Sequence, residues 1–141
     1  MVESLRIEGL FTAYDRADVL EDVNISVPAG TILEGIWGDS LANIEVAGVN
    51  GFSSGVVYRW DGSQALGVSL PPNTPELHAI DGASGDIYAA GEGGTVLHLT
   101  PGSSFATGLS APFSEGIYAL RAVRGDLWLA GRDCAILRKV P

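Results

Sequence analysis

Two histidines, and the acidic and aromatic residues aligned with them, are the side chains of this chain best suited to bind a ligand. His78 and His98 are the only histidines among 141 residues. His78 aligns with Glu34 and Tyr118 when the chain is divided into segments of about 42 residues. Imidazole, carboxylate and phenol groups at one repeated position could line a shared channel and bind a ligand there. The alternative interpretation is a solvent-exposed face without a specific role.

No metal site is predicted from these residues. Two copies of the chain would offer two His78 and two Glu34 side chains around a common axis, but the sequence has one cysteine and no run of clustered histidines. His98 aligns with Tyr58 and Arg138, and this position too is interpreted as an exposed face. We therefore predict no metal ion and no cofactor.

No catalytic set is predicted either. Cys134 has no histidine in its own repeat to serve as a base. Asp86 and Asp126 precede predicted strands and are expected to hydrogen-bond their own turns. Glycoside hydrolysis needs two carboxyl groups about 5 to 10 Å apart, and residues repeated once per segment are expected to lie farther apart. The glycine-rich "GEGGT" (91–95) lacks the lysine of a phosphate-binding loop and is interpreted as a hairpin turn.

Two aromatic residues stand directly before an aspartate. Tyr14 in "AYDR" and Trp60 in "RWDG" occupy equivalent places at the end of a predicted strand. An exposed aromatic ring beside an acid can stack on a sugar ring and bond its hydroxyl groups. Tyr14 and Trp60 are therefore a second candidate surface, for carbohydrate.

The elements that position these residues repeat along the chain. "NIEVAG" (43–48), "DIYAAG" (86–91) and "DLWLAG" (126–131) recur about every 42 residues, and "LEGI", "LHAI" and "IYAL" precede them in the same register. Each unit is interpreted as four short strands separated by turns rich in Gly, Pro, Asp and Ser. Four antiparallel strands in about 42 residues are typical of a β-propeller blade.

The pattern that begins "LHAIDG" and continues "GDIYAAGEGGTVLH" resembles the bacterial propeller repeats related to the photosystem II stability factor and, more distantly, the BNR repeats of sialidases. The resemblance covers residues 32–141 and implies a β-propeller fold. It implies no activity, because the shared residues are structural. Sialidases also carry an Asp box, S-x-D-x-G-x-T-W, whose spacing differs from that of "SGDIYAAGEGGTV" (84–96).

The predicted fold is an all-β β-propeller with about three four-stranded blades per chain, in a single domain of residues 1–141. We expect N-terminal strands that close a neighbouring blade (1–31), a blade (32–75), a second blade (76–116) and an incomplete third blade (117–141). Three blades are too few to close a ring. A homodimer with a six-bladed ring is therefore predicted, in which each N-terminal strand completes the other chain's last blade.

The charges at the two ends of the chain favour this head-to-tail dimer. Residues 1–30 carry six acidic and two basic residues, whereas residues 121–141 carry five basic and two acidic residues. Opposite charges attract across a head-to-tail interface. Two alternatives stay open: the basic end is a solvated surface, or the chain is one piece of a longer propeller.

Composition argues against two classes of partner. A net charge of −9 repels nucleic-acid phosphates and anionic membrane surfaces. The apolar runs are far shorter than the roughly 20 residues that span a bilayer. The start "VESLRIEGLF" lacks the basic and apolar regions of a signal peptide. With its single cysteine, the chain is expected in the cytoplasm.

These observations favour a non-enzymatic binding or scaffold module with propeller architecture, whose ligand the sequence does not identify; a protein and a glycan are both candidates. The alternative is a carbohydrate-binding, lectin-like or glycoside-hydrolysing propeller. The fold by itself does not separate the two, because propellers carry many unrelated functions.

Overall fold

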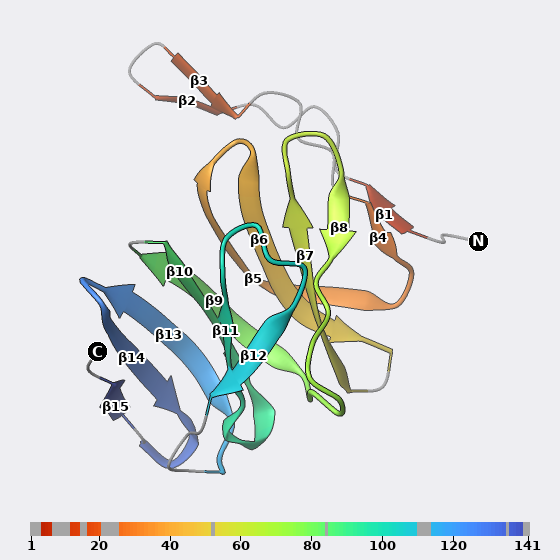
Figure 1. Cartoon of the computed structure of the whole chain (residues 1–141). Coiled ribbons are helices and arrows are strands. Elements are labelled where there is room, and N and C mark those ends of the chain that lie inside the picture. Colours follow the sequence, from red (N-terminus) through yellow and green to blue (C-terminus); the bar gives the residue numbers. More distant parts are fainter. Residues whose placement is uncertain are drawn as a thin grey trace.

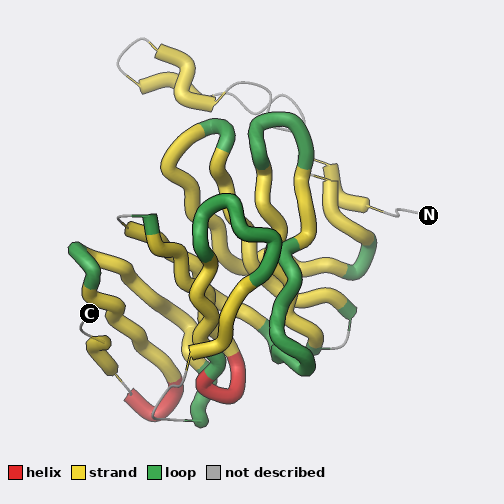
Figure 2. The backbone as a smooth tube through the Cα atoms, in the orientation of Figure 1, coloured by secondary structure: helices red, strands yellow, loops and turns green. Residues whose placement is uncertain are grey.

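The computed structural model of the protein describes residues 4–6, 12–14, 17–20, 26–51, 53–83, 85–109, 114–134 and 136–139. Within these residues the protein is all-β, as predicted: three antiparallel sheets of three or four strands and two short two-stranded sheets, with two single 3₁₀ turns (Figures 1 and 2). No helix of this described part is long and apolar enough to cross a membrane.

Each of the three larger sheets is a meander in which consecutive strands are neighbours. The first sheet contains β5 (Thr31–Ser40), β6 (Asn43–Asn50), β7 (Ser54–Trp60) and β8 (Ala65–Gly67). The second contains β9 (Leu77–Ala83), β10 (Asp86–Gly91), β11 (Val96–Leu99) and β12 (Ala106–Leu109). The third contains β13 (Ile117–Val123), β14 (Asp126–Gly131) and β15 (Ile136–Lys139).

Shorter elements complete the described chain. The 3₁₀ turns η1 (Glu92–Gly94) and η2 (Arg132–Cys134) follow β10 and β14. At the N-terminal side, β1 (Ser4–Arg6) pairs with β4 (Ser26–Pro28), and β2 (Thr12–Tyr14) pairs with β3 (Ala17–Leu20). Residues 1–31, predicted to close a neighbouring blade, thus form two hairpin-like pairs, with several residues outside the described part.

The three sheets lie side by side and contact one another through their first strands (Figure 1). Strand β9 contacts β5 on one side and β13 on the other. One hydrophobic cluster fills the space between the first and second sheets, and another fills the space between the second and third. The most deeply buried side chains of these clusters include Val57, Leu77, Ile87, Leu99 and Ile117. Packing on both faces of the second sheet therefore fixes the relative positions of the three first strands.

A glycine recurs where the first and second strands of each sheet meet: Gly48, Gly91 and Gly131. A Cβ atom added to Gly91 would overlap the backbone carbonyl oxygen of Glu76, and the other two glycines are crowded by a carbonyl oxygen in the same way. The Glu76 carbonyl also accepts a hydrogen bond from the Glu92 N–H at 2.9 Å. The repeated glycine in the sequence is thus explained by the close approach of two backbones.

A buried ion pair joins the first sheet to the second. The Glu45 side chain on β6 is fully buried and pairs with the Arg59 guanidinium on β7. Arg59 also donates to the carbonyl oxygens of Ser103 and Thr100, in the turn between β11 and β12. Burial raises the pKa of the Glu45 carboxyl, and Arg59 partly offsets this effect. The pair therefore connects two sheets at a position where an unpaired charge would be costly.

Candidate functional site

The three aligned residues Glu34, His78 and Tyr118 occupy the same irregularity in the three sheets. The pairing of β9 with β10 passes from Ala79 to Leu77 and leaves His78 without a cross-strand partner. Glu34 and Tyr118 are skipped in the same way in the first and third sheets. Such a β-bulge changes the direction of a side chain and is common near binding sites. The structure thus places all three predicted residues at one end of adjacent first strands.

His78 contacts both of its aligned neighbours. Its Nδ1 atom pairs with the carboxylate of Glu34, and its ring stacks on that of Tyr118 with 4.6 Å between the ring centroids. Its Nε2 atom lies 3.1 Å from Oε1 of Glu92 in η1. The imidazole is therefore held on both nitrogen atoms by carboxylates that come from two different sheets.

Tyr118 extends these contacts to the third sheet. Its hydroxyl donates to Oε1 of Glu92 at 2.8 Å and accepts from the Arg132 guanidinium at 2.6 Å. Arg132 lies 3.8 Å from the same Glu92 oxygen atom. A continuous chain of polar contacts thus runs from Glu34 in the first sheet to Arg132 in the third. With Glu76, described next, we call these six residues the polar cluster.

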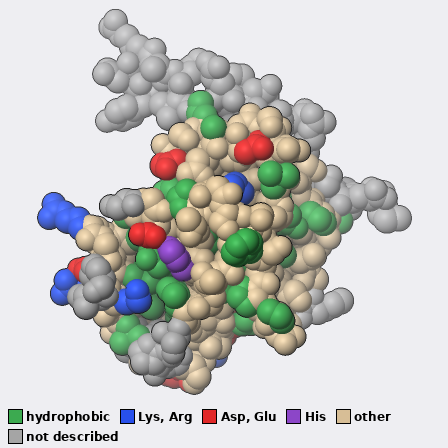
Figure 3. All heavy atoms as spheres, viewed as in Figure 1, with side chains coloured by type: hydrophobic (Ala, Val, Ile, Leu, Met, Phe, Trp, Pro, Cys, Tyr) green, Lys and Arg blue, Asp and Glu red, His purple; other side chains and the backbone are tan. Residues whose placement is uncertain are grey.

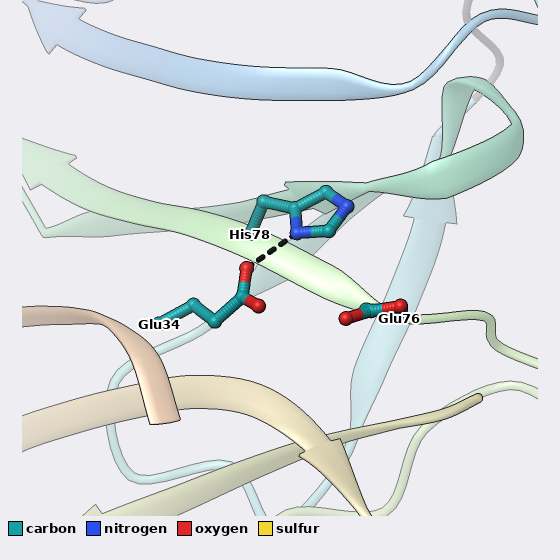
Figure 4. Close-up of side chains that lie close together, drawn as sticks. All are labelled: Glu34, Glu76 and His78. Atoms are coloured by element: carbon teal, nitrogen blue, oxygen red, sulfur yellow. Dashed lines mark hydrogen bonds and ion pairs between the residues drawn. The ribbon is translucent and has the colours of Figure 1, made fainter. Parts of the chain in front are cut away.

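A third carboxylate, that of Glu76, lies on the same side of the His78 ring as Glu34 (Figure 4). The ligand atoms of Glu34, Glu76 and His78 all lie within 4.8 Å of one another. Glu76 directly precedes β9, and its backbone carbonyl is held in the bulge by Glu92. The close approach of Gly91 to the Glu76 carbonyl therefore also fixes the backbone position from which the Glu76 side chain extends.

The charges of the polar cluster shift two pKa values. Burial disfavours the protonated imidazole of His78, but the carboxylates of Glu34 and Glu92 together outweigh burial and raise its pKa above the usual value. The hydrogen bonds from Tyr118 and His78 lower the pKa of Glu92. The arrangement can bind a cation, donate hydrogen bonds to a ligand through Arg132, or hold a proton on His78.

Sequence analysis did not identify Glu76, Glu92 and Arg132 as site residues. Glu92 and Arg132 occupy one repeated position, directly after the glycine that ends β10 and β14, where the first repeat has Val49. An acidic residue in one repeat and a basic residue at the same position of the next could have indicated a contact between neighbouring sheets. The predicted hairpin is present, since β10 and β11 pair across this turn. The signal was missed because the 3₁₀ turn within the hairpin, which contains Glu92, was not foreseen.

The second predicted surface is only partly described. Trp60 is half-buried, and its indole N–H donates to the carbonyl of Leu41 at 3.0 Å. The neighbouring Asp61 accepts hydrogen bonds from the backbone N–H groups of Ser63 and Gln64, which lower its pKa. Tyr14 lies in β2, but its side chain is outside the described part of the structure.

Two predictions about the second histidine need correction. Arg59, and not Tyr58, is the residue equivalent to His98, because Arg59 faces Glu45 as His98 faces Tyr88. The sequence alignment of the third strands was therefore displaced by one residue in the first repeat. In the first repeat this position lies between two sheets, and the Arg59 side chain there is only 11% exposed.

Asp86 and Asp126, which were predicted to hydrogen-bond their own turns, pair with basic side chains on the neighbouring third strands. Asp86 lies 2.7 Å from Nε2 of His98, and Asp126 accepts hydrogen bonds from Arg138 at 2.5 and 2.8 Å. Each aspartate begins the second strand of its sheet, directly across from the end of the third strand, so a basic side chain there can reach it.

Comparison of the chain with protein-family models, with curated proteins and with solved structures found no match. The function is therefore argued from the geometry of the polar cluster and of the sheets.

Proposed function

We propose that the chain is a non-enzymatic binding module with propeller architecture, in which the three sheets form half of a six-bladed ring. A second copy of the chain supplies the other half, head to tail. The polar cluster lies around the axis of this ring and is the ligand site. The observation that carries the proposal is the convergence of the equivalent bulged residues Glu34, His78 and Tyr118, as neighbouring blades around one axis require.

The exposure of one repeated position supports the second copy. Val57, Val96 and Ile136 are equivalent residues on the third strands of the three sheets, each paired with the alanine before the repeated glycine. The first two are buried against the following sheet, with 2% and 4% exposure. Ile136 is 71% exposed, because none of the larger described sheets packs against this face of the third sheet. This face, which also carries the exposed Trp128, has the composition of a blade interface without its partner.

The free face of the first sheet shows the complementary pattern. Ile80 on β9 and Leu120 on β13 pack against the preceding sheet. The equivalent Ile36 on β5 is 67% exposed, whereas Ile80 is 7% exposed, because none of the larger described sheets packs against that side of β5. Ile36 lines a shallow, mainly apolar hollow of about 460 Å³ together with Leu41 and Ile44. A second chain placed head to tail would cover each of these two faces with the other.

Charge also supports the head-to-tail arrangement. Lys and Arg side chains gather on the side of the molecule that the third sheet occupies (Figure 3). Within the chain, Glu92 reaches from the second sheet to Tyr118 on the third. Arg132 occupies the equivalent position in the third sheet, so in the ring it would reach Glu34 of the second copy. These two groups have opposite charge, which favours this register over a random contact.

Replacing Ile136 with glutamate is expected to weaken association at least about 30-fold, because a charge in the centre of an apolar interface costs as much as the loss of a hot-spot residue. The single chain should fold normally, since Ile136 is exposed in it. Sedimentation velocity over a concentration series measures the change in the dissociation constant.

Phe105→Glu is the matched control for this variant. Phe105 is exposed but lies at the outer edge of the first two sheets, where it forms a parallel bridge with Ser69. Its replacement is expected to leave the dissociation constant within about threefold of the wild-type value. Equal effects of the two substitutions, or none from Ile136→Glu, would contradict the proposed interface.

The carbohydrate alternative stays a prediction without added support from the structure. Trp60 bonds within its own sheet, and its place at the end of β7 lies on the face that the proposed ring covers. A glycan array with the wild-type chain and a Trp60→Ala variant would reveal a sugar site there.

A further inference from the structure

We infer that Glu34, Glu76 and His78 bind a divalent first-row transition-metal ion, with Zn²⁺ the best match to their donor atoms. This inference rests on the proposed function of the polar cluster as a ligand site and names the class of ligand. It does not depend on ring closure, because all three residues belong to one chain.

The first argument is the arrangement of the donor atoms. One imidazole nitrogen and two carboxylate oxygens lie within 4.8 Å of one another (Figure 4). An ion with bonds of about 2.0 to 2.2 Å to nitrogen and oxygen can bridge atoms at such separations after small side-chain rotations. Mixed imidazole and carboxylate ligands suit Zn²⁺ better than Ca²⁺ or Mg²⁺, which prefer oxygen alone.

The second argument is the environment of the other imidazole nitrogen. With Nδ1 of His78 directed at Glu34, Nε2 lies 3.1 Å from the carboxylate of Glu92. A histidine that binds a metal almost always donates its other N–H to a carboxylate or carbonyl, which fixes the ring and its tautomer. Glu92 is itself held by the Tyr118 hydroxyl at 2.8 Å. The structure therefore supplies an outer set of contacts as well as the inner ligands.

The third argument is electrostatic. Glu34 and Glu76 come from different sheets, yet their carboxylates lie close together. Two carboxylates at such a distance repel each other unless a cation lies between them. A protonated His78 offsets one of the two charges, and a divalent ion would offset both. Three protein ligands leave a fourth position of a tetrahedral ion free for water or for a donor atom of an external ligand.

Isothermal titration of the metal-free chain with ZnCl₂ tests this inference. We expect saturable binding of one Zn²⁺ per chain. Glu34→Gln and Glu76→Gln each remove one ligand and should weaken binding at least about 100-fold, whereas Glu92→Gln should weaken it about 10- to 100-fold through the orientation of His78. The matched control Asp39→Asn removes an exposed acidic charge outside the polar cluster and should bind as the wild type does.

Circular dichroism of each variant shows whether it is folded, so that a lost site is separated from a lost fold. Absence of saturable binding by the wild-type chain would overturn the inference, as would wild-type affinity in both Glu34→Gln and Glu76→Gln. Light scattering on the same samples separates this result from the ring. A dimer without zinc affinity contradicts the metal site alone, and a monomer that binds one zinc contradicts the ring alone.

Discussion

Arg59→Met is expected to lower the free energy of unfolding by about 3 to 5 kcal/mol at pH 7, because it leaves the buried carboxylate of Glu45 without its cation. Oε2 of Glu45 is already buried without a hydrogen-bond partner in the described part of the structure. The substitution also removes two hydrogen bonds to the turn that follows β11. Urea unfolding followed by tryptophan fluorescence measures the change.

This loss should depend on pH with a definite sign. Burial already raises the pKa of Glu45, and Arg59 is the group that lowers it. Without Arg59, the pKa of Glu45 in the folded variant rises further above its unfolded value. A carboxyl with a raised folded pKa favours folding when it is protonated, so stability is lost as pH rises through that pKa. The deficit of Arg59→Met should therefore shrink between pH 7 and pH 5.

Arg138→Met is the matched control, because Arg138 occupies the equivalent place in the third sheet. Arg138 pairs with Asp126, but the Arg138 side chain is half exposed. Loss of such a pair should cost less than about 1 kcal/mol and respond little to pH in this range. Equal costs for the two arginines would show that burial of Glu45 is not the cause.

Gly91→Ala is expected to cost about 3 kcal/mol or more, the upper end of the effect of overpacking. The added methyl group would overlap the carbonyl oxygen of Glu76, which cannot move without breaking its bond to the N–H of Glu92. The bulge at His78 depends on this approach, so the polar cluster should be displaced together with the backbone. Thermal unfolding and chemical shifts of the His78 ring report the two effects separately.

Gly67→Ala is the control for this glycine. It also lies in a strand, but the nearest atom to an added Cβ is Cε1 of Tyr58 at 4.0 Å, an ordinary contact. Its stability should stay within about 0.5 kcal/mol of the wild-type value. If Gly91→Ala is as stable as the wild type, the close approach of the two backbones is not the reason for the repeated glycine.

The sequence was sufficient to predict the strands and the equivalence of Glu34, His78 and Tyr118, because both follow from the repeat. Glu34, His78 and Tyr118 align once one extra residue in the β5–β6 hairpin is allowed for, and equivalent places in adjacent sheets put them together. Glu76 was beyond such reasoning, because it reaches the cluster through a β-bulge that depends on the close contact of two backbones. Glu92 was missed although it and Arg132 share one repeated position directly after the repeated glycine.

The free faces of the outer sheets show a second limit. Ile136 and Val57 are both β-branched residues in a third strand, and nothing in the sequence around them shows that one is exposed and the other buried. The burial of these two side chains depends on whether another sheet packs against their face of the sheet. Sequence reasoning therefore predicted that a second chain is needed from the number of repeats, but not which side chains it would cover.

The central claim is that two chains close one ring around the polar cluster, and the mass of the wild-type chain in solution tests it most directly. Light scattering behind size exclusion, over a dilution series, should give a mass near twice the 14.7 kDa of one chain. A single species at 14.7 kDa at every concentration would contradict the ring and leave both hydrophobic faces unexplained.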